Sequence, residues 1–202
     1  MQKQTDFVLI VLINFFLVLF IYALKNYLDR IIVNHYFQMF FWSISLLLSS
    51  LVLIKIFGLK IDLSLKAIKL RENLWTYIIA LAAGIGCGAW FFWLGETVPA
   101  TTSLIVLILD PILVAFAEEI NHRGLILRSA EEAFGTFRGI FLQAIFFSIV
   151  HLNPRFIFLL SYFGFAILAG FLSKKRYSGS IYCAIFFHFI TNITLYIINW
   201  IN

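Results

Sequence analysis

The feature that most constrains this chain is a succession of apolar segments, each about as long as a membrane-spanning helix. A bilayer core of about 30 Å is crossed by about 20 helical residues, and a helix satisfies its own backbone hydrogen bonds there. The sequence predicts an all-α, polytopic integral membrane bundle of about seven transmembrane helices in a single domain, residues 1–202. The predicted spans are Phe7–Leu24, Tyr36–Phe57, Leu74–Leu94, a fourth from near Thr102 through Glu118 and Glu119, Ile140–Leu152, Phe156–Leu172 and Ser180–Ile198.

The composition agrees with a membrane location. Only 12% of the residues are charged, whereas soluble domains carry about 25%. The net charge of +5 does not indicate a nucleic-acid partner, because the basic residues lie between apolar segments, where they set orientation in the membrane. With the N-terminus in the cytoplasm, only Lys25, Arg30 and Arg155 of the 15 basic residues fall outside. The segment Lys25–His35 is predicted as a polar loop.

The third span contains three glycines in the run Gly84-Ile-Gly-Cys-Gly88. Small residues four apart let two membrane helices approach closely. We expect this role rather than phosphate binding, because a phosphate-binding glycine loop opens a helix in water.

Ionisable residues lie within the fourth span. Glu118 and Glu119 follow an apolar run, and Arg123 comes shortly after. Such residues are costly at membrane depth and therefore indicate a functional site. Glu119 and Arg123 are spaced to pair on one helical face. Glu118 points about 100° away, so it is available for a different task.

The ends of this helix also have sequence signals. Asp110 and Pro111 are the residue types of an N-cap and a first helical position, which puts the acidic pair about two turns inside the helix. Phe134-Gly135 is typical of a helix stop, with glycine just past the last turn.

Two histidines and an asparagine lie in later spans. Glu118 and His151 are nearly equidistant from Gly135 in the sequence, so an antiparallel hairpin places both at about the same height, roughly 24 Å from the turn. A carboxylate and an imidazole that face each other can activate a water molecule. His188 and Asn192 share one helical face.

The height of His188 fits less well. It is only roughly 14 Å along the helix from the predicted turn at Ser178-Gly179. Helix tilt, a raised turn, or a hairpin of residues 123–138 that projects from the membrane would bring His188 to Glu118.

The three motifs together resemble those of the CPBP family, the CAAX proteases and bacteriocin-processing enzymes also called the Abi family. The motifs are Glu118-Glu119-xxx-Arg123, Phe147-xxx-His151 and His188-xxx-Asn192. The resemblance covers residues from about 100 to 198. It implies a catalytic core in residues 101–202, with the site in the last four spans, and variable scaffold helices in residues 1–100.

The resemblance also implies roles. Glu118 is expected to be the general base that activates water, with help from His151. His188 and Asn192 are expected to donate hydrogen bonds to the oxyanion of the tetrahedral intermediate. The remaining supporting residues are expected to orient the site: Glu119, Arg123 and His122.

His122 departs from the family pattern, which usually has an aromatic residue before the arginine. It follows Glu118 by four residues, so it could tune that carboxylate, fill the space of an aromatic ring, or supply a metal ligand.

The sequence therefore predicts an intramembrane endopeptidase without a cofactor or metal, acting on a peptide or membrane-protein substrate. The bias toward Phe, Ile, Leu, Asn and Lys indicates an AT-rich bacterial genome and a bacterial cell membrane. Two alternatives stay open. One is a zinc protease that uses His151, His188 and a glutamate, although no HExxH motif is present. The other is a non-proteolytic immunity or regulatory protein that keeps the fold.

Overall fold

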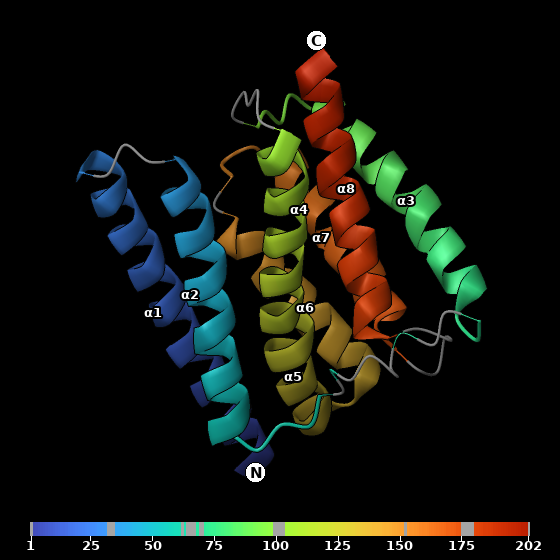
Figure 1. Ribbon diagram of the computed structural model, residues 1–202. Helices are drawn as coiled ribbons and strands as arrows, with labels where there is room; N and C mark the ends of the chain where they lie inside the picture. The colour runs from blue at the N-terminus through green and yellow to red at the C-terminus, as the bar shows by residue number, and fades with distance from the viewer. Residues whose placement is uncertain are drawn as a thin grey trace.

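In the computed structural model, every regular element is a helix within the described residues, which are 2–31, 35–61, 63, 68, 71–98, 104–151, 153–174 and 180–201. The predicted all-α class is confirmed. The helices are α1 (Gln2–Ile31), α2 (His35–Ile56), α3 (Leu74–Trp93), α4 (Leu104–Glu119), η2 (Ile120–Ile126), α5 (Leu127–Phe134), α6 (Thr136–Val150), α7 (Phe156–Leu172) and α8 (Ile181–Ile201). Because α4, η2 and α5 are continuous, the described residues form seven helical rods, with the two termini at opposite ends (Figure 1).

The outer surface of the bundle is apolar. Among the described residues, α1, α3 and α8 are long and apolar enough to cross a membrane, and α6, α7 and Phe40–Ile56 are shorter apolar helices. Phe16 and Phe20 of α1 are 66% and 63% exposed. Trp75 and Trp93, at the two ends of α3, are exposed as well, as interfacial tryptophans are. Soluble proteins do not expose apolar side chains on this scale, so this is an integral membrane protein.

The predicted polar loop at Lys25–His35 is wrong in its first part. Helix α1 continues through Ile31, and residues 32–34 lie outside the described residues. Lys25 and Asp29 form an ion pair of 2.5 Å between side chains four residues apart, which stabilises a helix. Polar composition therefore did not end this helix.

The predicted helix start at Asp110 and Pro111 is also wrong. Helix α4 begins at Leu104, and Pro111 lies inside it, where it removes one backbone N–H donor. The carboxylate of Asp110 accepts a hydrogen bond from the hydroxyl of Tyr196 in α8. Asp110 therefore links two helices. The position near Thr102 predicted for the start of the fourth span lies outside the described residues.

The predicted helix stop is confirmed. Helix α5 ends at Phe134, and Gly135 adopts a φ of 83°, a conformation that costs glycine little. Helix α6 then begins at Thr136. The chain thus forms the expected hairpin between the rod of the acidic pair and the helix that leads to His151.

The central rod α4–η2–α5 lies between two helix pairs, with α1 and α2 on one side and α3 and α8 on the other (Figure 1). Helix α3 packs along α8 more extensively than any other pair of elements. A Cβ atom at Gly84 would lie 2.7 Å from Ile190 Cγ2, and one at Gly88 would lie 2.5 Å from the Thr191 carbonyl oxygen. The predicted close helix approach through these glycines is confirmed.

Replacing Gly88 with valine should force α3 and α8 apart and lower the free energy of unfolding by about 1–3 kcal/mol, the usual cost of overpacking. Gly86→Val is the matched control, because a Cβ atom at Gly86 meets nothing within 4 Å. Thermal unfolding in detergent micelles measures both variants. Equal losses for the two would mean that helix propensity, and not the close approach, explains the effect.

Candidate functional site

A cavity of about 220 Å³ lies between α4, α7, α8 and the C-terminal ends of α3 and α6. All four residues predicted to be catalytic line it: Glu118, His151, His188 and Asn192. They come from α4, the residue that follows α6, and α8. The rest of the wall is largely aromatic and aliphatic. The structure thus brings together side chains that are up to 74 residues apart in the numbering of the chain.

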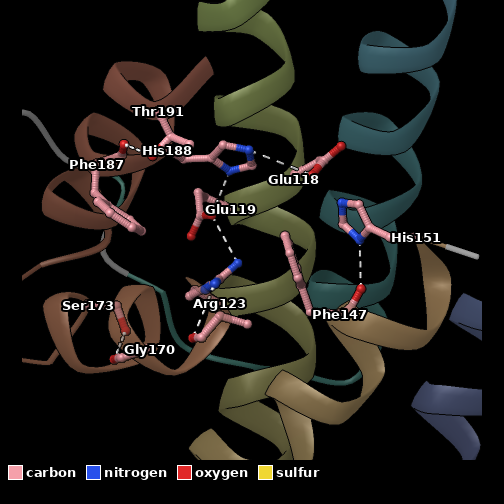
Figure 2. Close-up of polar contacts among 11 residues, drawn as sticks. Glu118, Glu119, Arg123, Phe147, His151, Gly170, Ser173, Phe187, His188 and Thr191 are labelled. Atoms are coloured by element: carbon pink, nitrogen blue, oxygen red, sulfur yellow. Dashed lines mark hydrogen bonds and ion pairs between the residues drawn. The ribbon is translucent and has the colours of Figure 1, made fainter. Parts of the chain in front are cut away.

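Glu119 is fully buried and has two partners (Figure 2). Its Oε1 atom accepts hydrogen bonds from Arg123 Nη1 and His188 Nδ1, both at 2.9 Å. Arg123 also donates from Nη2 to the carbonyl oxygen of Ala166 in α7 at 3.3 Å, and its guanidinium lies 5.0 Å from the centre of the Phe147 ring. Glu119 and Arg123 therefore connect the central rod to α6, α7 and α8. The predicted pairing of these two residues is confirmed.

Glu118 occupies a different environment. Its side chain keeps 15% of its accessible surface and faces the cavity, whereas that of Glu119 keeps none. The nearest approach to His188 is 3.9 Å, between Glu118 Oε2 and His188 Nε2, which is too long for a direct hydrogen bond. This carboxylate is therefore open to a molecule in the cavity.

In His151 and His188, hydrogen bonding shows that the Nδ1 atom of each ring carries a proton. His151 Nδ1 lies 2.7 Å from the Phe147 carbonyl oxygen (Figure 2), and a carbonyl only accepts, so Nδ1 donates and Nε2 remains for other partners. The His151 ring also stacks on Tyr162, with centroids 4.1 Å apart. In His188, Nδ1 faces Glu119 and Nε2 faces Glu118. Each imidazole is thus held in a defined orientation.

The segment that follows the acidic pair is a π-helix. In η2, residues Ile120–Ile126 are all buried, and the Leu127 N–H donates to the His122 carbonyl, five residues earlier. Short π-helical turns are rare and often occur at functional sites. The sequence pattern predicts an ordinary α-helix here, because no local signal distinguishes the two helix types.

His122 does not reach the cavity. Its side chain is buried, and its ring packs edge-on against Phe147, with centroids 4.8 Å apart. The space-filling interpretation fits this position best. As for a metal site, the part of the chain that the structure describes contains no group of three or more His, Cys, Asp or Glu side chains arranged to hold an ion.

Five further polar residues line the cavity that sequence reasoning did not assign to it: Glu96, Asp110, Tyr162, Thr191 and Tyr196. The Tyr162 hydroxyl donates to Glu96 at 3.3 Å, and the Tyr196 hydroxyl donates to Asp110. Tyr196 could have been found, because it lies two helical turns after His188 on the same face. Glu96 and Tyr162 carried no such signal. They come from a loop and a helix that meet the site only in the folded bundle.

Comparison with known protein families gives a match over the part of the chain that contains these site residues. Residues 99–194 match the family model described as type II CAAX prenyl endopeptidase Rce1-like, so the predicted family resemblance is confirmed. The matched region contains every predicted site residue. A search of the curated proteins found no match.

Proposed function

Because residues 99–194 match the family model of Rce1-like type II CAAX prenyl endopeptidases, we propose that this protein hydrolyses a peptide bond inside the membrane with a water molecule activated by Glu118. The observation that carries the proposal is that the two adjacent carboxylates lie in different environments. Glu119 is buried against Arg123 and His188, whereas Glu118 faces the cavity.

In the proposed reaction, Glu118 takes a proton from water, and the oxygen attacks the carbonyl carbon of the scissile bond. His151 accepts a hydrogen bond from the same water at Nε2. His188 and Asn192 donate hydrogen bonds to the oxyanion, a contribution of a few kcal/mol per donor in other enzymes. For this role His188 carries a proton on both nitrogens, since Nδ1 already donates to Glu119. The C–N bond then breaks, and Glu118 returns its proton to the leaving amine.

The surroundings of the site are part of the proposal. All seven helical rods would lie in the membrane, including the shorter α6 and α7, with the N-terminus in the cytoplasm as the basic residues favour. The substrate would be a membrane-associated or free peptide in a bacterial cell membrane. Because helical hydrogen bonds shield a peptide bond, the cleaved segment would enter in an extended form from the cytoplasmic side.

Mass spectrometry of membranes tests this function even while the substrate is unidentified. Cells that make the wild-type protein should contain at least one new peptide terminus that is absent from cells with the Glu118→Ala variant. Identical termini in the two, together with an unchanged biological function, would instead identify a non-proteolytic membrane protein.

Removal of metal ions should leave the purified enzyme active. The proposed chemistry uses only carboxylate, imidazole and amide groups, so cleavage of the peptide found by mass spectrometry should proceed at the same rate after dialysis against a chelator. A loss of activity that zinc restores would support the zinc alternative.

A further inference from the structure

A second set of buried polar side chains lies on the side of η2 away from the cavity. Asn14 of α1, Ser50 of α2 and Asn121 of η2 are 6%, 0% and 0% exposed. The two asparagines exchange hydrogen bonds of 3.3 and 2.7 Å, and Asn121 Nδ2 also donates to the Ser50 hydroxyl at 2.8 Å. We call these three residues the polar cluster. It joins three helices by side-chain bonds alone.

Packing does not explain why polar groups occupy these positions. Apolar side chains would fill the same space without a cost of desolvation, whereas interhelical hydrogen bonds in membranes contribute little to stability. Such bonds do constrain the relative orientation of the helices, because donor and acceptor must face each other with the correct geometry. Asn121 lies between Glu119 and Arg123 in the sequence. A constraint on the orientation of Asn121 therefore also constrains the orientation of the acidic pair, Glu118 and Glu119.

The constraint on the orientation of Asn121 matters because η2 is a π-helix. A turn closed over five residues contains one residue more than an α-helical turn, and one residue corresponds to about 100° of rotation. Conversion of η2 to an α-helix would therefore rotate Glu119 relative to the residues after η2. It would also turn Asn121 away from Asn14 and Ser50. The bonds of the polar cluster thus favour the π-helical form over the α-helical one.

We propose that the polar cluster positions the acidic pair: by holding η2 in its π-helical form, it keeps Glu119 hydrogen-bonded to His188 and keeps Glu118 facing the cavity. Two of its members lie outside residues 99–194, so α1 and α2 take part in forming the active site. The effect on catalysis depends on the proposed peptidase function, whereas the effect on His188 does not.

The sharpest test compares Ser50→Ala with Ser49→Ala. Both hydroxyls donate to the Leu46 carbonyl oxygen, at 2.6 and 2.9 Å, but only Ser50 accepts a bond from Asn121. Cleavage of an internally quenched CAAX peptide, with and without a farnesyl group, should show a kcat about fivefold lower for Ser50→Ala at unchanged KM, as expected for one net hydrogen bond. Ser49→Ala should match the wild type. Equal kcat values for the two variants would overturn the proposal.

A double variant separates positioning from stability. Asn14→Leu with Asn121→Leu removes both amides and leaves neither unpaired, so the unfolding temperature should stay near that of the wild type. We still expect kcat to fall more than in Ser50→Ala. Full activity in a stable double variant would show that the cluster does not position the acidic pair, and would overturn the proposal.

Nitrogen-15 NMR of the histidines gives a readout that needs no substrate. The chain has only 4 histidines, so single substitutions assign the signals. Ser50→Ala should shift the His188 signals, and Ser49→Ala should not. Unshifted His188 signals in Ser50→Ala would overturn the proposal even in an active peptidase. A shift in a protein that cleaves nothing would support the positioning and refute the peptidase function.

Discussion

Glu118→Gln is expected to lower kcat for peptide hydrolysis by about 10²–10⁴-fold, the usual contribution of a general base. Glutamine has nearly the same shape but cannot take a proton from water. The native carboxylate faces the cavity, and its nearest approach to His188 is 3.9 Å, so its replacement should change the free energy of unfolding by less than about 1 kcal/mol. Steady-state kinetics and denaturant unfolding of the purified variant measure the two effects separately.

Glu132→Gln is the matched control for this experiment. Glu132 is an exposed acid on the same helical rod, so it undergoes the same loss of charge without contact with the cavity. Its kcat should equal that of the wild type. If Glu118→Gln keeps a kcat within about tenfold of the wild type, Glu118 is not the general base. The proposal that Glu118 is catalytic and Glu119 is supporting would then be wrong.

Arg123→Met should lower the free energy of unfolding by about 3–5 kcal/mol, the usual cost of breaking a buried ion pair. Arg123 is 2% exposed, and its removal leaves the Glu119 carboxylate buried without its cation. The bond to the Ala166 carbonyl oxygen is lost as well. Denaturant unfolding in micelles measures the change. We also expect the variant to lose activity, because Glu119 would no longer hold His188 in a fixed orientation.

Arg128→Met provides the comparison, because Arg128 has a 42% exposed side chain and only a 3.6 Å contact to Glu131. Exposed pairs contribute about 0–1 kcal/mol, so this variant should unfold like the wild type. Adding Glu119→Gln to Arg123→Met removes the uncompensated charge and should restore part of the lost stability. Equal losses for Arg123→Met and Arg128→Met would mean that the buried pair does not support the fold.

Local features of the fold were predictable from local signals. Helix α7 has the predicted bounds, Phe156–Leu172, because its apolar run is interrupted on both sides. Gly135 ends a helix because it adopts a positive φ. Glu119 and Arg123 pair because side chains four residues apart on a helix are neighbours. In each case the cause lies within a few residues of the effect.

The wrong predictions concern features that depend on contacts between distant helices. Asp110 is bonded to Tyr196 of α8, so a partner from a distant helix outweighed the local pattern of a helix start. Likewise, His188 reaches Glu119 at 2.9 Å, although its distance from the predicted turn argued for a different height. That turn, Ser178-Gly179, lies outside the described residues, and the relative heights of helices depend on packing along their whole lengths.

The sequence by itself determined that the chain is a helical membrane protein and which ionisable residues are candidates for its functional site, because apolar length and the cost of buried charge are properties of single segments. Only the tertiary structure decided that Glu119 is hydrogen-bonded to His188 and that Glu118 faces a cavity that Glu96 and Tyr162 also line. It also decided that η2 is π-helical, with Asn14 and Ser50 bonded to it. These outcomes depend on contacts between helices that are far apart in the chain, and the free energy of such contacts is defined only once the helices have packed.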